Sequence, residues 1–390
     1  MQHTVEEAQR PPARERVLDW LAGQSQAMQE LLQQIVNIDS GSRNEAGVTA
    51  VAEALRARLQ AAGIAVQFEP VPGYGVLLHA QVPGAEPGPP IVLMGHMDTV
   101  YPAGTAARRP FRVEDGRAYG PGVADMKSGL VLNVFVAEAL ARCGGLQGPL
   151  HLFFSCDEEI GSPATRDRIM AQVRGAKAVF NAEPGRVSGN LVTSRKGSMV
   201  VAFEVEGVAA HAGINHAAGA SAIEALARKT LALHALTDPA TGVTVNVGVV
   251  QGGIVPNMVA PHAKAEVDLR FTADTDPEAL LERVRAIVEE ESVPRTQGRI
   301  TESRRTLPMK PTPGELLALY QRGARALGFE VQGEFTGGAA DSGLTASVGV
   351  PTLCGTGPVG GHAHTEREYC ELATFVPRAQ AVALAVLDHP

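Results

Sequence analysis

The chain has 390 residues, of which 45% are hydrophobic and 19% are charged. This average composition excludes a disordered or fibrous protein, and the length is sufficient for two compact domains. The net charge is −8 and the 34 basic residues form no run, so nucleic acid is not an expected partner.

The N-terminal segment lacks the basic region and the apolar region of a Sec signal. No apolar stretch approaches the roughly 18 residues of a membrane span. The cysteines are scattered without a CxxC pair, which argues against a disulfide framework and favours small core residues. They are Cys143, Cys156, Cys354 and Cys370. We therefore expect a reduced, cytoplasmic protein that does not act at a membrane.

The first half of the chain is predicted to alternate helices and strands. Apolar residues at helical spacing predict helices over 48–62 and 127–142. Continuous apolar runs predict strands that are buried on both faces, over 89–96, 149–156 and 178–183. This order indicates an α/β domain whose mainly parallel sheet is flanked by helices.

The pattern changes near residue 195. Residues 199–207 and 263–271 alternate apolar and polar side chains, as strands do when only one face of an antiparallel sheet is covered. A helix over 217–236, a strand over 243–250 and a helix starting near residue 276 complete this segment. It is predicted to be a smaller, inserted α+β domain.

After about residue 305 the α/β pattern returns. A helix is expected near 313–327, a strand over 350–355 and a closing helix over 372–387. The larger domain is therefore predicted to be discontinuous. It would comprise 1–194 and 305–390, with 195–304 as the inserted domain.

Reactive side chains follow the strands of the predicted sheet. In open α/β sheets, the ligand site lies beyond the carboxyl ends of the strands. We therefore expect one edge of the sheet to gather two imidazoles and several carboxylates. The side chains at these positions are His96, Asp98, Asp125, Asp157, Glu158, Glu159, Glu183 and His364.

A mixture of imidazole and carboxylate ligands suits a divalent cation, for which zinc is the default. Two cations fit better than one, because a single carboxylate such as Asp125 can bridge them. Each motif also has a plainer interpretation. A lone His-x-Asp after a strand is more often structural, and His362 and His364 could be surface residues. The metal site is preferred because all these groups fall at strand ends.

A nucleotide-dependent oxidoreductase is the interpretation suggested by Gly355, Gly357 and Gly360. They follow a strand and have the spacing of a dinucleotide-binding loop. That pattern alone is weak, and no helix is expected after it because the next residues are polar and irregular. A nucleotide loop is therefore not predicted here.

Eight segments resemble the dizinc peptidases and deacylases that include glutamate carboxypeptidase, acetylornithine deacetylase and succinyl-diaminopimelate desuccinylase. They are HMDTVYP (96–102), PFRVEDGRAYGPGVADMKSG (110–129), DEEIGS (157–162), NAEP (181–184), AAHAG (209–213), VPN (255–257), VDLR (267–270) and HTEREY (364–369). They span nearly the whole chain in the expected order. The first two look most like the glutamate carboxypeptidase branch.

The resemblance implies two Zn²⁺ per subunit, with Co²⁺ or Mn²⁺ as substitutes. His96 and Glu183 would hold one ion, Glu159 and His364 would hold the other, and Asp125 would bridge them. The two metals would lower the pKa of a shared water toward about 7.

The resemblance also implies roles for the groups beside these ligands. Asp98 would accept a hydrogen bond from the far nitrogen of His96. Glu158 would be the general base, taking a proton from the zinc-bridging water and passing it to the leaving nitrogen. Because successive residues at a strand end point to opposite sides, Glu159 could ligate while Glu158 faces the cleft.

The inserted domain would act as a lid and mediate a homodimer, again by resemblance. His211 would reach the partner subunit's site and stabilise the oxyanion there. Asn257 and Arg270 match substrate-binding positions, and Arg270 would pair with the substrate carboxylate. The plainer alternatives are a turn residue for His211 and an ion pair on an alternating strand for Arg270.

The implied activity is metal-dependent hydrolysis of an amide bond in a peptide or N-acyl amino acid that carries a free carboxylate. Carboxypeptidase-like cleavage is favoured over deacylation. Ala340 stands where carboxypeptidase relatives often have threonine, so no preference for C-terminal glutamate is predicted. Further candidate carboxylate contacts are Arg195, Lys196, Arg304 and Arg305. A non-catalytic binding protein on this scaffold is the alternative, but it should have lost a ligand or the base, and none is missing.

Overall fold

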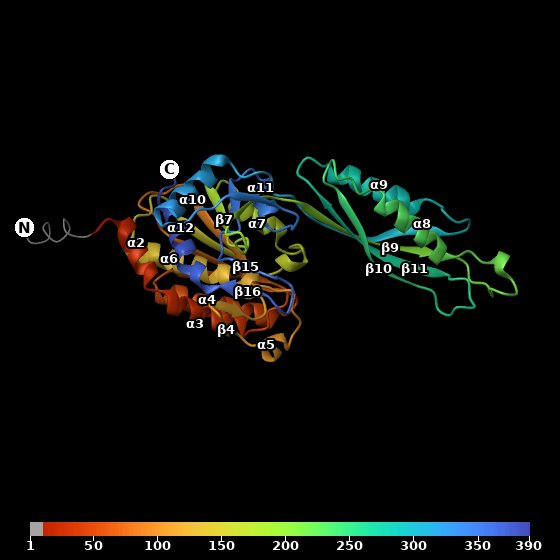
Figure 1. Cartoon of the computed structure of the whole chain (residues 1–390), viewed down its shortest axis with the longest axis horizontal. Helices are drawn as coiled ribbons and strands as arrows, with labels where there is room; N and C mark the ends of the chain where they lie inside the picture. Colours follow the sequence, from red (N-terminus) through yellow and green to blue (C-terminus); the bar gives the residue numbers. More distant parts are fainter. Residues whose placement is uncertain (1–10) are drawn as a thin grey trace, which may run out of the picture. The chain divides into compact units, whose positions relative to one another are not determined.

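The computed structural model describes residues 11–390, which form two compact units (Figure 1). The first unit contains the described residues up to Ser194 together with Pro311–Phe335 and Leu344–Pro390. The second unit contains Arg195–Lys310 and Thr336–Gly343. The expectation that the N-terminus carries no signal falls partly on residues 1–10, which lie outside the described residues.

An eight-stranded sheet forms the centre of the first unit. Its strands, in spatial order, are β1 (Ala65–Val71), β2 (Gly75–Val82), β6 (Leu150–Ser155), β3 (Ile91–His96), β7 (Ala178–Asn181), β14 (Thr352–Cys354), β8 (Leu191–Arg195) and β13 (Gly333–Thr336). The central strands β6, β3, β7 and β14 run parallel, whereas β1 and β2 are antiparallel to their neighbours and β8 is antiparallel to β14. All six residues of β3 are buried, as its continuous apolar run predicts.

Helices flank this sheet (Figure 1). They are α2 (Ala13–Ala22), α3 (Ser25–Val36), α4 (Glu45–Ala61), α5 (Thr105–Arg108), α6 (Ser128–Cys143), α7 (Arg166–Val173), α10 (Gly314–Ala326), α11 (Ser342–Ser347) and α12 (Phe375–Leu387). Helix α6 contacts β3 and β6 as well as α2, α3, α4 and α12, and is buried from Ser128 to Leu140. It is therefore the central helix of the unit.

The start of α6 packs tightly against the loop that follows β7. A Cβ atom at Gly129 would lie 1.9 Å from the carbonyl oxygen of Ala182, the residue before Glu183. Only glycine allows this approach without a shift of the backbone. The close contact thus fixes the loop that carries Glu183 against the central helix.

A second, small antiparallel sheet in the first unit was not predicted. Its order is β15 (Gly360–Gly361), β16 (Tyr369–Glu371), β5 (Arg117–Tyr119) and β4 (Arg112–Glu114). In it Tyr369 is paired with Tyr119. The pairing brings the segment after His364 beside the glycine-rich loop before Asp125.

The second unit has a four-stranded antiparallel sheet. Its order is β10 (Thr244–Gly252), β11 (His262–Phe271), β9 (Gly197–Glu206) and β12 (Gln297–Thr306). Buried and partly buried residues alternate along β9, as the period-two pattern predicts. The helices α8 (Ala222–His234) and α9 (Pro277–Glu289) lie on the same face of the sheet (Figure 1). They cover a core that includes Phe203, Leu226, Leu269 and Val284.

The caps of these two helices explain where they begin. The Asp276 carboxylate accepts hydrogen bonds from the amides of Glu278 and Ala279, so α9 starts at its Asp-Pro sequence as predicted. The predicted start of α8 at residue 217 is wrong. The Ser221 hydroxyl accepts a hydrogen bond from the Glu224 amide and caps the helix there, so α8 begins at Ala222.

The predicted fold class is confirmed: a mixed α/β unit around a sheet with a parallel centre, and a separate antiparallel α+β unit. Within residues 11–390, no helix combines the length and the hydropathy needed to cross a bilayer. No disulfide joins the described cysteines. Cys156, Cys354 and Cys370 are buried as expected, whereas Cys143 is partly exposed at the end of α6.

Candidate metal centre

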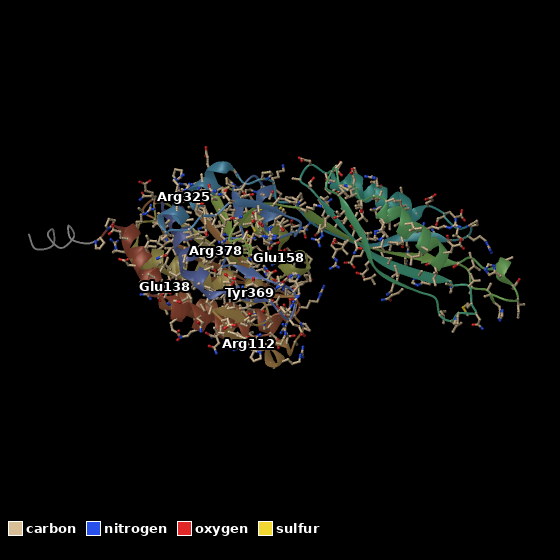
Figure 2. All side chains as sticks on the ribbon, in the orientation of Figure 1. Arg112, Glu138, Glu158, Arg325, Tyr369 and Arg378 are labelled. Carbon is tan, nitrogen blue, oxygen red and sulfur yellow. The ribbon has the colours of Figure 1, made fainter. Side chains whose placement is uncertain are left out.

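The carboxyl ends of the central parallel strands meet at one edge of the first unit's sheet. His96 is the last residue of β3. Glu158 and Glu159 form a 3-10 turn after β6, and Glu183 follows β7. The Glu158 side chain is labelled in Figure 2. Neighbouring parallel strands thus deliver one imidazole and three carboxylates to a single edge.

Asp125 lies between two imidazoles. Its Oδ1 is 3.3 Å from Nε2 of His96, and its Oδ2 is 3.3 Å from Nε2 of His364. The peptide bond between Asp125 and Met126 is cis. Each oxygen of one carboxylate therefore faces a different nitrogen ligand, as a carboxylate shared by two cations would require.

The other carboxylates divide between the two imidazoles. Glu183 Oε1 and Glu158 Oε2 lie 3.9 and 3.8 Å from Nε2 of His96. Glu159 Oε2 lies 3.2 Å from Nε2 of His364. The structure thus brings together all five predicted ligands and the predicted base, whose individual roles stay predictions.

Two sets of ligand atoms, which share His96, are each compact enough to hold a cation. His96 groups with Asp125 and Glu159 in one set and with Glu158 and Glu183 in the other, with all ligand atoms of a set within 4.8 Å of one another. Imidazole nitrogens and carboxylate oxygens are ligands that zinc accepts. Moreover, Oε1 of Glu159 is buried and accepts no hydrogen bond from any described residue. A buried anionic oxygen without a donor fits a cation at this position.

The charges in the cluster depend on one another. Burial alone would raise the pKa of Asp125, but hydrogen bonds from His364 and His96 lower it below its ordinary value. Burial would lower the pKa of His96, but hydrogen bonds to Asp125 and Asp98 raise it well above its ordinary value. Hydrogen bonds to Asp125 and Glu159 raise the pKa of His364 to about 10. Cations that bind here would therefore replace protons on the imidazoles.

Glu159 has the opposite tendency within the same cluster. Burial raises the pKa of its carboxyl to about 7, and the nearby Asp125 carboxylate adds to the rise. Divalent cations bound between these two carboxylates would relieve their repulsion. The donor set, the burial and the electrostatics all fit a centre for divalent cations.

Asp98 fixes two segments of this edge. The side chain is fully buried. Nδ1 of His96 lies 3.0 Å from the backbone oxygen of Asp98 and 3.3 Å from its Oδ1, so either oxygen sets the tautomer that leaves Nε2 available. The carboxylate also accepts hydrogen bonds from the amides of Glu158 and Glu159, both at 3.1 Å, and from the Ser42 hydroxyl at 2.6 Å. Ser42 was not predicted to take part.

The strand-end argument for Glu158 and Glu159 is wrong. It assumed that successive side chains alternate as in a strand, but the two residues lie in a 3-10 turn. Both side chains consequently lie close to a histidine. Asp157, also at this strand end, belongs to no ligand set. Its carboxylate accepts hydrogen bonds from the Ala164 amide and the Thr165 hydroxyl and so holds the following loop.

The structure places His211, Asn257 and Arg270 in the second unit. Nδ1 of His211 accepts hydrogen bonds from the amides of Gly213 and Ile214, which leaves Nε2 to carry the proton. The amide of Ala212 donates to the backbone oxygen of Asn257 at 3.0 Å, so these two loops lie side by side. The role of His211 as an oxyanion donor stays a prediction.

Arg270 forms an ion pair along its own strand, which is the plainer of the two interpretations given for it above. Its Nε donates to Oδ2 of Asp268 at 2.9 Å, on the same strand. The further arginine candidates also have partners within the second unit. Arg195 donates to the carbonyl of Gly338, Arg304 pairs with Glu302, and Arg305 pairs with Glu278. A substrate carboxylate would have to compete with these contacts.

The glycine loop after β14 is held by a buried arginine that sequence reasoning missed. Arg378 donates to the carbonyl oxygens of Gly355 and Gly357, and its side chain is labelled in Figure 2. A Cβ atom at Gly357 would lie 2.3 Å from the oxygen of Ala182. No helix follows the loop, as predicted; the short strand β15, which was not predicted, follows it instead. These glycines serve close packing.

Comparisons with known proteins find a matching family model and similar proteins. The family model described as Peptidase family M20/M25/M40 matches residues 92–388. Carboxypeptidase G2 from Pseudomonas sp. (strain RS-16) is 28% identical over 373 residues, covering 93% of this chain and 89% of that protein. A succinyl-diaminopimelate desuccinylase from Leptothrix cholodnii is 27% identical over 371 residues, covering 89% of this chain and 94% of that protein.

Solved structures share the fold. An M20 family metallo-carboxypeptidase from Sulfolobus solfataricus gives a TM-score of 0.77 at 17% identity, covering 93% of this chain and 99% of that chain. A dinuclear metal binding peptidase from Bacillus subtilis gives a TM-score of 0.68 at 17% identity, covering 93% and 97% of the two chains. At such identities the likeness shows a common architecture.

Proposed function

The chain belongs to peptidase family M20/M25/M40, as its motifs led us to expect, and we propose that it is a carboxypeptidase-like amidohydrolase with two zinc ions. Membership makes it a metallohydrolase of the peptidase or deacylase kind. The proposed substrate is a peptide or N-acyl amino acid with a free carboxylate. The observation that carries the proposal is the position of Asp125, with one oxygen toward each of two imidazoles.

The proposed ligands are those that the strand ends bring together. His96 and Glu183 would hold one ion, Glu159 and His364 would hold the other, and Asp125 would bridge. The distances among these atoms, from 3.2 to 3.9 Å, support the assignment. Bound there, two cations would supply Lewis acidity to a water molecule and to the scissile carbonyl.

Glu158 is the proposed general base. It takes a proton from the nucleophilic water and then donates that proton to the leaving nitrogen. Its support is positional, because its carboxylate borders the cluster while its backbone amide is held by Asp98. Asp98 thereby orients both the base and His96 without contacting the substrate.

The second unit is the proposed lid and dimerisation domain. His211 would donate from Nε2 to the developing oxyanion of the partner subunit's substrate, while Asn257 and Arg270 bind the substrate. On substrate binding, Arg270 would give up its ion pair with Asp268 and pair with the substrate carboxylate instead. The homodimer is supported by the edge strand β10, on which Val249 and Val250 are exposed.

Deacylation of an N-acyl amino acid is the second candidate. It is favoured by the similarity to a succinyl-diaminopimelate desuccinylase over most of the chain. Both reactions cleave an amide with the same groups, so only the substrate differs. The similarity to a carboxypeptidase covers a comparable share of the chain.

Metal analysis combined with a hydrolysis screen tests the proposal. We expect about two zinc ions per chain and cleavage of dipeptides in preference to acetylornithine or succinyl-diaminopimelate, with loss of activity in a chelator and recovery on adding zinc. Equal or faster cleavage of the two acylated amino acids would transfer the assignment to deacylation. A zinc-saturated protein that hydrolyses neither class would contradict both.

A further inference from the structure

Glu368 is a buried carboxylate that holds the loop before Asp125. The residue is 1% exposed and was not predicted to belong to the site. Its Oε1 accepts hydrogen bonds from the amides of Ala124 and Asp125 at 2.9 and 3.0 Å. Its Oε2 accepts from the amide of Gly122 at 3.1 Å and from the Tyr101 hydroxyl at 2.6 Å. Each oxygen therefore accepts two hydrogen bonds.

These four contacts join three segments that are far apart in the sequence. Tyr101 lies five residues after His96. The three amides belong to the loop that ends at Asp125. Glu368 itself lies four residues after His364, and the Tyr101 hydroxyl is also 2.9 Å from the backbone oxygen of Thr365. Every segment that meets at Glu368 thus carries one of the proposed ligands.

The three amides lie at the N-terminal end of the irregular helical turn Val123–Lys127, where backbone amides have no acceptor within the turn. Gly120 and Gly122 both have positive φ before this turn, and Asp125 and Met126 have non-helical backbone angles inside it. Backbone amides that are buried without a partner are costly, and a carboxylate is a strong acceptor for them. Glu368 therefore determines the path of the backbone into Asp125.

We propose that Glu368 and Tyr101 are positioning residues that hold Asp125 and the two histidines at the spacing of a two-cation centre. This inference rests on the proposed function, because it assumes that Asp125 is shared by two cations. Neither residue contacts the substrate or a cation in this assignment. Both act through the backbone of the ligand-bearing loops.

Asp98 supplies a parallel within the same unit. It accepts hydrogen bonds from the amides of Glu158 and Glu159 as Glu368 does from those of Ala124 and Asp125. Two buried carboxylates thus hold the two loops that carry acidic groups of the centre. The buried side chain of Lys127 also interacts with Glu368, although burial lowers the pKa of this lysine to about 7.

Glu368→Gln is the sharpest test, since it keeps the shape of the side chain. In either orientation of the amide, an NH₂ group replaces an oxygen that accepts two hydrogen bonds, and at least one backbone amide then faces another donor. We expect zinc affinity to fall by about 10- to 100-fold, the range seen for groups that orient metal ligands. Tyr101→Phe removes one of the four donors and should cause a smaller loss.

The measurements are zinc dissociation constants, from competition with a chromophoric chelator, and the visible absorption spectrum of the cobalt-loaded protein. The spectrum reports the geometry of the ligands, which a merely structural role would leave unchanged. With saturating zinc, we also expect kcat to fall while KM changes little. Circular dichroism verifies that each variant is folded.

Two matched controls come from the same unit. Glu371→Gln removes a carboxylate three residues away, on strand β16, that pairs with Arg117. Tyr320→Phe removes a buried hydroxyl that has no hydrogen-bond partner among the described residues. Both controls should keep the zinc affinity and the cobalt spectrum of the original chain.

The outcomes separate this inference from the proposed function. If the original chain binds no zinc, the proposed function fails. If it binds two ions, and Glu368→Gln keeps its affinity within about twofold and an unchanged cobalt spectrum, the inference alone is overturned. If Glu368→Gln does not fold, Tyr101→Phe decides by the same two readouts, and weaker zinc binding with an altered spectrum supports the inference.

Discussion

Oε2 of Glu158 lies 3.8 Å from Nε2 of His96. This is as close as Oε1 of Glu183, which lies 3.9 Å from the same nitrogen. Distance therefore does not distinguish a ligand from a base at these two positions. The exposure of the two side chains agrees with our assignment of Glu158 as the base and Glu183 as a ligand, because the Glu158 side chain is 13% exposed and that of Glu183 is 7% exposed. A base must reach water and substrate, whereas a ligand need not.

Glu158→Gln should abolish most turnover and spare metal binding. Loss of a general base costs about 10²- to 10⁴-fold in kcat. The zinc content should stay near that of the original chain, and Glu183→Gln should lose zinc instead. Paired measurements of kcat and metal content check this. If Glu158→Gln lost an ion, Glu158 would be a ligand, and if it kept a normal kcat, it would not be the base.

His211→Ala should lower kcat by about 10²- to 10³-fold, the cost of removing one oxyanion donor. Zinc content should not change, because the residue is not a proposed ligand. His216→Ala is the control, since His216 is an exposed histidine of the same loop. Loss of zinc in His211→Ala, with turnover per bound ion preserved, would instead give His211 a structural role.

Zinc should raise the thermal stability of the first unit. A ligand that binds only the folded state adds about 2.7 kcal/mol of stability at 100 times its dissociation constant. The gain should be marked here because binding relieves the repulsion between Asp125 and Glu159. Melting curves recorded in a chelator and in excess zinc provide the measurement. Identical curves would argue against a cation at this centre.

Two histidines on neighbouring strands should make stability depend on pH. Burial lowers the pKa of His79 below the ordinary 6.5, although Glu69 opposes this. Burial and the charge of His79 lower the pKa of His151. Below about 6.5 the unfolded chain therefore binds more protons than the folded chain, so stability falls as the pH is lowered through this range.

His151→Gln should make this pH dependence shallower. The change removes the lowered pKa of His151 from the balance of bound protons. Urea unfolding at pH 5.5 and 7.5, compared between variant and original chain, cancels contributions from other groups. His389→Gln, a partly exposed histidine outside the sheet, is the control. An unchanged difference between the two pH values would contradict the prediction.

Gly129→Ala should weaken the centre through packing alone. Its Cβ would lie 1.9 Å from the oxygen of Ala182, so the loop that carries Glu183 must move. We expect a loss of stability together with weaker zinc binding. Gly314→Ala is the matched control, because Gly314 is also in the first turn of a helix and a Cβ atom there meets nothing within 4 Å. Equal effects of both substitutions would show that the close contact does not matter.

The sequence predicted the fold correctly where the pattern of apolar residues follows the burial of the strands. The apolar runs of β3, β6 and β7 predicted the parallel centre of the sheet, and with it the edge at which the reactive groups gather. The strands β4, β5, β15 and β16 were not predicted because they are two or three residues long, and all three residues of β4 are exposed. These short strands form because they pair with neighbouring strands, and their sequences carry no hydrophobic periodicity that would reveal them.

The supporting groups of the site could not be predicted for a related reason. Tyr101 and Glu368 both lie inside segments that resemble the family, yet their partners are backbone amides of a loop without periodicity. Ser42 lies in no such segment and contacts Asp98 across 56 positions of the sequence. Such contacts follow from the paths of loops in three dimensions, which the spacing of residues does not encode.

The pairing of β16 with β5 has a consequence for the order of assembly. It joins residues near position 370 to residues near position 118, and His364 is delivered only by this late segment. A chain still being synthesised exposes His96, Asp125 and Glu159 long before their second imidazole emerges from the ribosome. Until residue 364 has emerged, the nascent chain therefore lacks one of the proposed ligands, and a product truncated before residue 364 would be left with an acidic cluster at the edge of its sheet.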